Sequence, residues 1–560
     1  MPESQLPFNK KRLEPRYWRR RKSVLAQFPA QLQALAREKW YLRAYLQALP
    51  IEMIGPPQYA PQLTRSMQKM ERRNLIYPVQ GDLLVHVYPD LTDERDFYIP
   101  IEPNLVVGLD DVVEKVDAKL LDWAEEIGQA ATPNREKVFM RALNKICTLR
   151  PGVDNGQIHM TPLTFQALRY QVLRDKLRMG SLQPLIYDPY IEDISCSGVG
   201  NVFVEHKIFK SLKSSISFAS HDELDDFVVW LGERIGRPVT LRHPIVDAVL
   251  PDGSRINMVY GRDIAKRGSN FTIRKFSEEP LSILNLIDFG TLDYLTAAYL
   301  WLVIEEGLNV FVAGATASGK TTTLNALTTF VPSDGKIVSI EDTPELQMPH
   351  ENWVREVVRE TSRSEGHSAV GMFDLLKAAL RQRPDRIMIG EIRGAEGNIA
   401  FQAMQTGHGV MSTFHAASVQ KLIQRLTGEP INVPKPYVDN LDLVVIQAAV
   451  RGLDGQLVRR VVSVNEIVDY NPVDHTYSFI TAFRWKPEDD TFEFSGDMNS
   501  FVLEDKIAMR RGLPEAQRRH IYTELRRRAR VLERIHKNAG ITGFQRLFDI
   551  VSEGRKRGAI

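Results

Sequence analysis

The sequence predicts an α/β fold in which residues 281–470 form a mainly parallel sheet covered by helices, preceded by an α+β domain. Strand-like apolar runs alternate there with helical patterns, which is typical of parallel sheets. One run, 309–313, leads into a glycine-rich turn and a helical stretch. Two others, 336–340 and 386–390, are each followed by a carboxylate. Because ligands of open α/β sheets bind at the carboxyl ends of strands, we expect the functional site at that edge.

The turn after residue 313 carries the Gly-x-x-x-x-Gly-Lys-Thr pattern of a phosphate-binding loop. Its glycines let backbone N–H groups turn towards a β-phosphate, and the following helix presents the positive end of its dipole. Lys320 is predicted to reach the β- and γ-phosphate oxygens, and the Thr321 hydroxyl to ligate Mg²⁺. The predicted nucleotide-binding residues are Gly314, Ala315, Thr316, Ala317, Ser318, Gly319, Lys320, Thr321 and Thr322.

Carboxylates at the ends of two further predicted strands supply the acidic groups for Mg²⁺ and water that a phosphate loop itself lacks. Glu341 follows the run 336–340, and Glu391 follows the run 386–390. Beside a phosphate loop, one carboxylate can complete the Mg²⁺ shell while another orients or deprotonates the attacking water. We interpret Glu391 as a ligand of Mg²⁺ and water, and Glu341 as the general base. Solvated acids at strand ends are the alternative.

Two histidines flank another strand-like run, residues 410–414: His408 precedes it and His415 follows it. A lone histidine is more often structural than catalytic. A pair around a core strand favours a role for both as sensors of the γ-phosphate or of its attacking water.

The composition is that of a large globular protein without a dominant charge. The 560 residues are 43% hydrophobic with a formal net charge of +2. We find no apolar run of about 18 residues, the length that spans a membrane. The first residues lack the apolar core of a signal peptide, so we expect the protein in the cytoplasm. The spacing of Cys147 and Cys196 suggests neither a disulfide framework nor a zinc site.

Basic residues gather near the start of the chain. Between Lys10 and Lys22, eight Lys or Arg residues stand against the single acid Glu14, with Tyr17 and Trp18 interleaved. Such an arm suits anionic lipid headgroups, and it suits nucleic-acid phosphates equally well. A solvated tail without a partner is the third interpretation.

Four motifs together resemble those of the type II/type IV secretion ATPases, where they are called Walker A, Asp box, Walker B and His box. In this chain they are the phosphate loop, residues 340–345, residues 390–394 and residues 406–416. Finer features at 188–194, 346–353 and 373–385 resemble the archaeal branch, which contains the archaellum assembly and rotation ATPase and the archaeal type IV pilus assembly ATPases. The resemblance extends over residues 185–470 and is looser elsewhere.

This resemblance implies a RecA-like P-loop ATPase domain preceded by a sensor-like N-terminal domain, with ATP between the two and six protomers in a ring. It implies Mg²⁺-dependent ATP hydrolysis that powers the assembly or rotation of a surface filament or secretion system. The implied partners are a polytopic membrane platform protein and an accessory cytoplasmic ATPase-like regulator. The implied location is the inner face of the cell membrane. The basic arm adds an anionic membrane surface as an expected contact, and we expect no nucleic acid as a partner. The cysteine insertion that binds zinc in some bacterial assembly ATPases is absent.

Two arginines of the first domain, Arg255 and Arg274, are candidates for arginine fingers that neutralise transition-state charge. Surface ion pairs are the alternative.

The competing function is a ring-shaped nucleic-acid translocase, because RecA-like rings also move DNA. Against it stand the balanced net charge and the lack of a recognisable nucleic-acid-binding module.

The expected organisation has four segments, with a linker around residues 276–280. They are a helix-rich N-terminal extension with the basic arm (1–155), an α+β sensor-like N-terminal domain (156–277), the RecA-like ATPase core (278–470) and a C-terminal appendage of mixed strands and helices (471–560).

Overall fold

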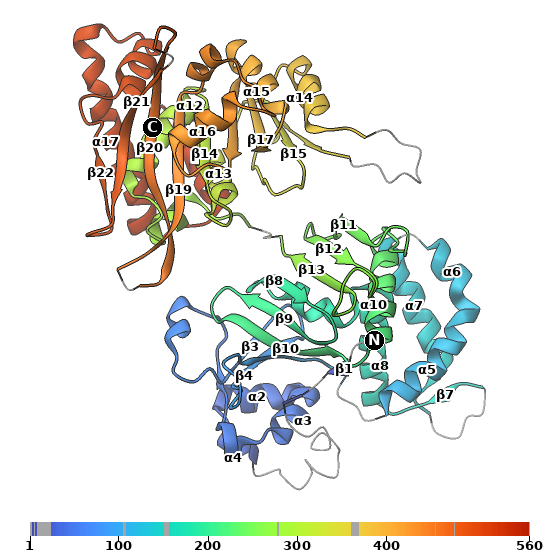
Figure 1. The fold of residues 1–560 in the computed structure, drawn as a ribbon. Coiled ribbons are helices and arrows are strands. Elements are labelled where there is room, and N and C mark those ends of the chain that lie inside the picture. Colours follow the sequence, from blue (N-terminus) through green and yellow to red (C-terminus); the bar gives the residue numbers. More distant parts are fainter. Residues whose placement is uncertain are drawn as a thin grey trace. The chain divides into compact units, whose positions relative to one another are not determined.

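The computed structural model describes residues 3–4, 6–7, 24–104, 108–130, 132–150, 156–276, 279–359, 369–453, 455–474 and 476–558 (Figure 1). The basic arm from Lys10 to Lys22 lies outside the described residues. The chain divides into two compact units, Met1–Ser277 and Glu278–Ile560. The further boundaries expected near residues 155 and 470 remain predictions.

The first unit is built on one mixed sheet. Among the described residues it has eleven strands, in the order β11-β12-β13-β8-β9-β10-β5-β4-β3-β2, with β1 paired to β10. These strands are β1 (Glu3–Ser4), β2 (Gln58–Tyr59), β3 (Leu75–Pro78), β4 (Leu84–Tyr88), β5 (Phe97–Ile101), β8 (Ile191–Cys196), β9 (Gly200–His206), β10 (Lys210–Phe218), β11 (Ile245–Val249), β12 (Arg255–Val259) and β13 (Asn270–Arg274). A separate pair is formed by β6 (Cys147–Thr148) and β7 (Ile158–His159).

Helices of the first unit pack in three groups. The apolar faces of the first helices, including Leu32 and Leu42, cover β3–β5, and a second group forms a helical cluster around Val116 and Leu143. The last helix packs Leu224 and other apolar residues into the main sheet core. The helices are α2 (Ala30–Glu38), α3 (Trp40–Ala48), α4 (Ile51–Ile54), α5 (Leu109–Leu120), α6 (Ala124–Gln129), α7 (Thr132–Ile146), α8 (Pro162–Leu177), α9 (Gln183–Tyr187) and α10 (His221–Arg234).

Residues 1–155 contain strands as well as the expected helices. β5 pairs in parallel with β10, so β2–β5 continue the sheet formed by residues after 190. β3 and β4 are short and almost wholly buried. Strands buried on both faces lack the polar–apolar alternation that identifies a strand in a sequence, which explains why the pattern did not predict them.

The carboxylate of Asp188 joins residues from both sides of position 155. Its Oδ2 accepts hydrogen bonds from the hydroxyls of Tyr77 on β3 (2.5 Å) and Tyr98 on β5 (2.9 Å), and its Oδ1 accepts one from the Tyr190 N–H (2.8 Å). Burial raises the pKa of Asp188, against the effect of these donors. The two segments therefore share one polar core.

His86 on β4 is buried with both ring nitrogens engaged. The Tyr45 hydroxyl lies 2.8 Å from Nδ1, and the Asn74 Oδ1 lies 2.8 Å from Nε2. Burial lowers the pKa of His86 to about 3. Because an unfolded histidine titrates near pH ~6.5, the unfolded chain binds a proton that the folded chain excludes below that pH. The free energy of unfolding therefore falls as the pH drops from ~6.5 towards 3.

We expect this histidine to lower the free energy of unfolding by roughly 2.3 kcal/mol between pH 6.5 and 4.5. His86→Phe removes the titration, so its apparent unfolding temperature should depend less steeply on pH than that of the wild type, whatever its absolute value. Thermal unfolding between pH 7.5 and 4.5 measures both slopes. The exposed His159 provides a control, because His159→Gln should keep the wild-type slope. Equal slopes for His86→Phe and the wild type would refute the assignment.

The second unit contains a nine-stranded sheet in the order β16-β15-β17-β18-β14-β19-β20-β21-β22 among its described residues. Pairs from β16 to β19 are parallel and pairs from β19 to β22 are antiparallel, which confirms the α/β class. The strands are β14 (Val310–Gly314), β15 (Ile337–Glu341), β16 (Trp353–Val357), β17 (Arg386–Ile392), β18 (Gly409–Phe414), β19 (Leu443–Arg451), β20 (Leu457–Asn471), β21 (Thr476–Lys486) and β22 (Thr491–Phe494).

Helices cover both faces of this sheet, and β14 is buried between them. Its residues alternate, so that Val310 and Val312 join one apolar core while Phe311 and Ala313 join another. The first core includes α12, α13, α17 and α18, and the second includes α14, α15 and α16. The helices are α11 (Ile283–Asp288), α12 (Tyr294–Glu305), α13 (Lys320–Leu327), α14 (Met372–Arg381), α15 (Glu396–Gln405), α16 (Val419–Thr427), α17 (Ile521–Glu533) and α18 (Phe544–Lys556).

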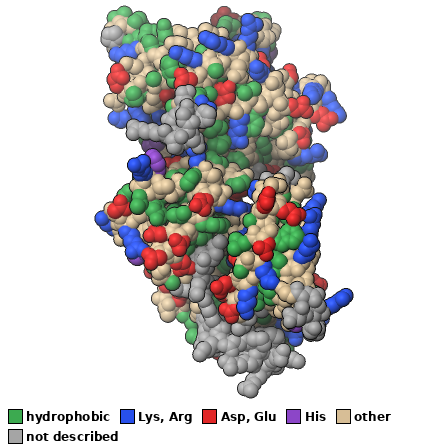
Figure 2. Space-filling view, turned by 90° about the vertical axis from the view of Figure 1, so that its right-hand side faces the viewer, with side chains coloured by type: hydrophobic (Ala, Val, Ile, Leu, Met, Phe, Trp, Pro, Cys, Tyr) green, Lys and Arg blue, Asp and Glu red, His purple; other side chains and the backbone are tan. Residues whose placement is uncertain are grey.

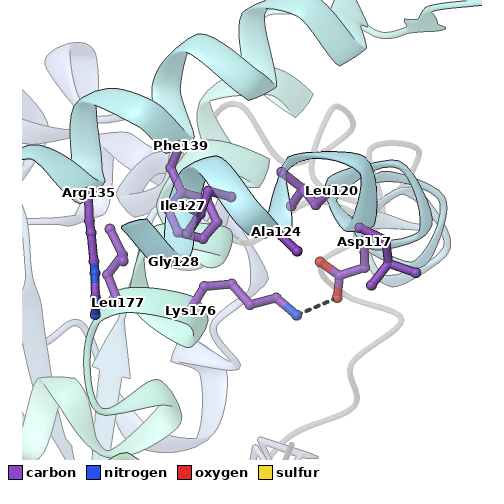
Figure 3. Close-up of a pocket in the computed structure, with 10 residues that line it drawn as sticks. Asp117, Leu120, Ala124, Ile127, Gly128, Arg135, Phe139, Lys176 and Leu177 are labelled. Atoms are coloured by element: carbon purple, nitrogen blue, oxygen red, sulfur yellow. Dashed lines mark hydrogen bonds and ion pairs between the residues drawn. The ribbon is translucent and has the colours of Figure 1, made fainter. Parts of the chain in front are cut away.

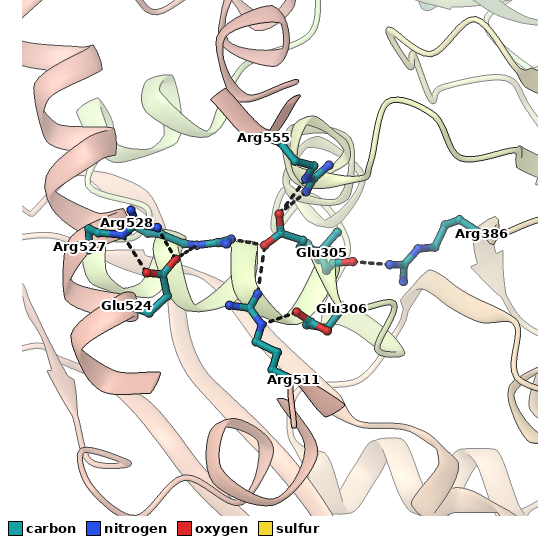
Figure 4. A network of polar contacts seen from close by, with 9 residues as sticks. Glu305, Glu306, Arg386, Arg511, Glu524, Arg527, Arg528 and Arg555 are labelled. Atoms are coloured by element: carbon teal, nitrogen blue, oxygen red, sulfur yellow. Dashed lines mark hydrogen bonds and ion pairs between the residues drawn. The ribbon is translucent and has the colours of Figure 1, made fainter. Parts of the chain in front are cut away.

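A cluster of charged residues around Glu305 connects the C-terminal helices to the end of α12 (Figure 4). Glu305 accepts hydrogen bonds from Arg555 of α18 at 2.8 and 2.6 Å, and it forms ion pairs with Arg528 of α17 and with Arg511. The Arg528 side chain is only 3% exposed and also binds Glu524 at 2.9 Å. Glu305 is therefore the shared anion for three segments of the last 50 residues.

Removing this carboxylate should destabilise the second unit, because Arg528 would stay buried with one of its two partners lost. For Glu305→Ala we expect a loss of about 3 kcal/mol, the usual cost of breaking a buried ion pair. Glu553→Ala is the control, since Glu553 pairs with Arg557 at the surface, where such pairs contribute about 0–1 kcal/mol. Chemical unfolding followed by tryptophan fluorescence compares the two variants. Similar small losses in both would show that the cluster contributes little.

Charges of both signs are intermixed over the face seen in Figure 2. In the part of the chain that the structure describes, no helix is both long enough and apolar enough to cross a membrane.

Candidate active site

The carboxyl ends of four neighbouring parallel strands meet at one edge of the second unit's sheet. β15, β17, β18 and β14 are adjacent in that order and run in the same direction. Glu341 ends β15, Glu391 lies near the end of β17, His415 follows β18, and the loop 314–319 follows β14. Groups from four separate stretches of sequence thus gather at the edge where ligands of such sheets bind.

Two glycines shape the loop 314–319. A Cβ on Gly314 would lie 2.2 Å from the carbonyl oxygen of Gln447, so no larger residue fits there. Gly319 has a φ of +94° and caps the N-terminus of α13, a conformation that favours glycine. The Ser318 hydroxyl donates to the Ala315 carbonyl at 2.8 Å and closes the turn. The cradle required by a phosphate group is therefore present.

Lys320 opens α13 and reaches back over the loop. Its Nζ donates to the Ala315 carbonyl at 3.0 Å. Burial lowers the pKa of Lys320, while the charge of Glu391 acts in the opposite direction. Thr321 and Thr322 follow in the first turn of the helix, the first half-buried and the second exposed. The ammonium group and these hydroxyls are thus available at the positive end of α13.

Glu341 is almost completely buried, with an exposed fraction of 1%. Its Oε1 accepts hydrogen bonds from the N–H groups of Glu345 and Leu346, both at 2.8 Å, which fixes the turn after β15. Its Oε2 makes no hydrogen bond with the described residues and lies 3.6 Å from the Arg355 Nε. Burial raises the pKa of this carboxyl group, which makes its ionised form a stronger base. Gly390 gives it space, since a Cβ there would lie 3.3 Å from the Glu341 Cγ.

Glu391 is more accessible and pairs with Arg393. The Arg393 Nε donates to the Glu391 Oε2 at 2.9 Å, and Nη1 lies 4.0 Å from the Asp342 Oδ2. The hydrogen bond to Glu391 raises the pKa of Arg393. The pairing of β17 with β18 shifts register between Ile389 and Glu391, and such irregularities re-aim side chains beside active sites. Arg393 was not singled out from the sequence, although it lies within the Walker B motif.

The two predicted histidines lie at opposite ends of β18. His415 follows the strand, and its Nε2 lies 2.9 Å from the Thr316 Oγ1 in the phosphate loop. His408 precedes the strand and contacts Thr406, with 3.0 Å between its Nδ1 and the Thr406 Oγ1. The six residues of β18 separate the histidines by about 20 Å. The interpretation of His408 as a phosphate sensor is therefore not supported within one chain, because a strand that passes through the sheet carries its two ends to opposite edges.

Arg255 and Arg274 lie in the first unit, on β12 and β13. They are direct partners in the antiparallel pairing of these strands, so their side chains share one face of the sheet. Both are exposed; Arg274 is 3.4 Å from the Asp193 Oδ1, and Arg255 is 4.0 Å from the Asp247 Oδ1. The structure thus brings the two candidates together, which the sequence did not predict.

Two residues of the β19–β20 hairpin also contact the phosphate loop and were missed. Gln447 is buried, and its Nε2 would lie 3.0 Å from a Cβ on Gly319. Arg459 donates from Nε to the Ala317 carbonyl at 3.2 Å. Neither residue belongs to a recognisable motif. Their position beside the loop depends on the register of β14, β19 and β20, which cannot be derived from the sequence.

A separate hollow of about 380 Å³ lies among α5–α8 of the first unit (Figure 3). Its apolar lining includes Leu120, Ile127 and Phe139, and two further lining residues, Lys176 and Asp117, form an ion pair of 2.8 Å. None of the residues that line it belongs to the predicted site. It is distinct from the edge of the second unit's sheet.

The residues at the sheet edge fit a nucleotide with Mg²⁺. The Thr321 hydroxyl and the Glu391 carboxylate are oxygen donors of the type that Mg²⁺ prefers, and this ion takes its remaining ligands from phosphate and water. Within the described ranges, no group of three His, Cys, Asp or Glu residues could hold a metal ion by itself.

The chain is similar to several known proteins. Residues 175–484, more than half of the chain, match the family model for type II/IV secretion system protein. The uncharacterized protein MJ0900 of Methanocaldococcus jannaschii is 41% identical over 524 residues, 91% of this chain and 94% of that protein. Protein VirB11 of Agrobacterium fabrum is 30% identical over 261 residues, 41% of this chain and 74% of VirB11.

Among solved structures, the Legionella pneumophila ATPase DotB is similar with a TM-score of 0.37 and 18% identity, covering 65% of this chain and 92% of DotB. The family match includes the phosphate loop, both acid-ended strands and His415. The chain belongs to the type II/IV secretion system protein family.

Proposed function

We propose that this chain is an Mg²⁺-dependent ATP hydrolase. The observation that carries the proposal is the meeting of the phosphate loop, Lys320, Glu341 and Glu391 at one sheet edge. A loop that only binds phosphate does not need a buried carboxylate with a raised pKa on a neighbouring strand. Membership of a family that includes VirB11 adds support.

The residues divide the hydrolysis of ATP between them. Residues 314–322 hold the phosphates through backbone N–H groups, and Lys320 neutralises charge on the β- and γ-phosphate oxygens. Glu341 accepts a proton from water through Oε2 as the water oxygen bonds to the γ-phosphorus, and the bond from that phosphorus to the β–γ bridging oxygen breaks to release ADP. Glu391, with Thr321, would hold Mg²⁺, which supplies charge neutralisation to the phosphates when bound. Because Oε2 is buried, the turn after β15 must open enough to admit water.

His415 is proposed to sense the state of the phosphate loop. Its ring contacts Thr316 inside the loop, and its carbonyl accepts a hydrogen bond from Arg425 on α16. A shift of Thr316 on nucleotide exchange would reach α16 through this histidine. For Arg255 and Arg274, we propose contact with the phosphates during turnover, from the same protomer or a neighbouring one.

At the level of the assembly, we propose a homohexamer that powers an archaellum or type IV pilus-like filament. It would act at the inner face of the cell membrane on a polytopic platform protein, with an accessory ATPase-like regulator as a further partner. The family model that matches this chain is described as type II/IV secretion system protein, which supports a motor of this class.

An ATPase assay with three additions tests the proposed class against a nucleic-acid translocase. We expect stimulation of ATP turnover by vesicles containing anionic lipid, and none by neutral vesicles or by double- or single-stranded DNA at physiological salt. Stimulation by DNA, together with DNA binding that weakens steeply with salt, would instead identify a translocase. Absence of ATP hydrolysis under every condition would refute the proposed activity.

A further inference from the structure

The hairpin formed by β19 and β20 brings an exposed arginine to the phosphate loop. β19 is the parallel neighbour of β14, and Gly314 is paired with Gln447 in this ladder. From the second strand of the hairpin, the Arg459 Nε donates to the Ala317 carbonyl at 3.2 Å, and its Cδ would lie 3.1 Å from a Cβ on Gly319. The guanidinium therefore lies along the rim of the loop, with its two terminal nitrogens not engaged by the loop carbonyl.

A β-bulge in β20 places the side chain of Arg459, and not that of Arg460, beside the phosphate loop. Ile446 pairs with Ser463, but Gln447 pairs with Val461, so Val462 is an extra residue on β20. Beyond the bulge Arg459 is opposite Ala449, which places its side chain on the face that carries Gln447. An uninterrupted ladder would have placed Arg460 there instead. As it is, Arg460 pairs with Asp490 at 2.7 Å through two of its nitrogens.

The strand order indicates which end of the nucleotide this hairpin meets. In the sheet, the strands are ordered β17-β18-β14-β19-β20, and the phosphate loop follows β14. Glu391 on β17 and Arg459 on β20 therefore lie on opposite sides of the loop. Lys320 reaches the β- and γ-phosphate oxygens, and Glu391 on β17 is the proposed Mg²⁺ ligand beside them, so the γ-phosphate end faces β17. The loop cradles the α- and β-phosphates. Arg459 is then beside the α-phosphate.

We propose that Arg459 is a nucleotide-contacting residue that binds the α-phosphate from the β19–β20 hairpin, with the buried Gln447 as the side chain that positions the loop beneath it. This inference rests on the proposed function, since it concerns the same nucleotide. A guanidinium suits the role because its planar fork matches two phosphate oxygens. When nucleotide binds, the guanidinium of Arg459 exchanges its hydrogen bond to the Ala317 carbonyl for hydrogen bonds to the charged α-phosphate oxygens, which are stronger acceptors.

Nucleotide titrations of Arg459→Ala test this assignment. We expect the affinities for fluorescent ADP and for a non-hydrolysable ATP analogue to fall equally, each by about tenfold, since the α-phosphate is common to both. The rate at saturating ATP should stay within about twofold of the wild type, so the loss appears in KM and not in kcat. Arg459→Lys should recover part of the affinity, because it keeps the charge without the fork.

Arg451 supplies a matched control on the same hairpin. It is exposed and donates to the Gly455 carbonyl at 3.2 Å, within the hairpin turn, so Arg451→Ala should bind both nucleotides like the wild type. Wild-type affinity in Arg459→Ala would overturn the inference, and a loss confined to the ATP analogue would overturn the placement at the α-phosphate. If the unaltered protein binds neither nucleotide, the proposed function itself fails.

Discussion

Replacing Lys320 with alanine is expected to weaken the binding of ADP and ATP by at least about a hundredfold, a loss near 2.7 kcal/mol. The ammonium group lies over the phosphate loop, and its Nζ is 3.0 Å from the Ala315 carbonyl. Without it, the negative charge of the phosphates would meet only backbone dipoles at this position.

Glu391→Gln provides the contrasting variant. It keeps the shape of the side chain and a partner for Arg393, so nucleotide should still bind while turnover falls by at least about a hundredfold.

Titration with fluorescent ADP and a steady-state phosphate-release assay separate the two effects. Lys421→Ala is the control for loss of a lysine, because Lys421 is exposed on α16 and interacts with Gln424 at 3.3 Å. It should bind and hydrolyse like the wild type. Equal loss of binding in Lys320→Ala and Glu391→Gln would contradict the separate roles. It would indicate that Glu391 supports the loop itself.

The part of the site that could be predicted from sequence is the part specified by local chemistry. The loop between β14 and α13 needs glycines at fixed spacing, because a Cβ at residue 314 would collide with a neighbouring strand. Glu341 and Glu391 end apolar runs, and parallel strands bring their carboxyl ends to one edge. From these constraints, the α/β class and the position of the site follow without knowledge of the strand order.

The remaining features depend on register, strand direction and burial. His408 and His415 are seven positions apart in the sequence, yet β18 carries them to opposite edges. Arg459 lies on the loop's side only because Val462 is extra in its ladder. In the first unit, β3 and β4 were missed because burial on both faces removes the alternation that reveals a strand. No single-sequence pattern encodes these three features.

Replacing Arg274 with alanine should lower the rate of ATP turnover by at least about tenfold, equivalent to roughly 1.4 kcal/mol of transition-state stabilisation, with nucleotide affinity changed much less. The expectation rests on two exposed guanidinium groups held side by side on β12 and β13. Two such cations repel each other, with their carboxylate neighbours Asp193 and Asp247 only at 3.4 and 4.0 Å, and a bound phosphate group would offset this repulsion. Arg274→Lys should restore little activity, because a single ammonium cannot form the paired contacts of a guanidinium with phosphate oxygens.

The alternative for Arg274 is a surface ion pair with Asp193, whose Oδ1 lies 3.4 Å from the Arg274 Nε. Asp193→Asn distinguishes the two roles, since it removes the ion pair and keeps the guanidinium. If Arg274 acts on nucleotide, Asp193→Asn should turn over ATP like the wild type while Arg274→Ala does not. If the pair is only structural, the two variants should behave alike, with a change in stability of at most about 1 kcal/mol. Arg262→Ala, which removes another exposed arginine paired with Asp222, controls for the loss of charge from the same unit. Wild-type turnover in Arg274→Ala would leave Arg255 as the candidate, because it is the partner of Arg274 on the same face.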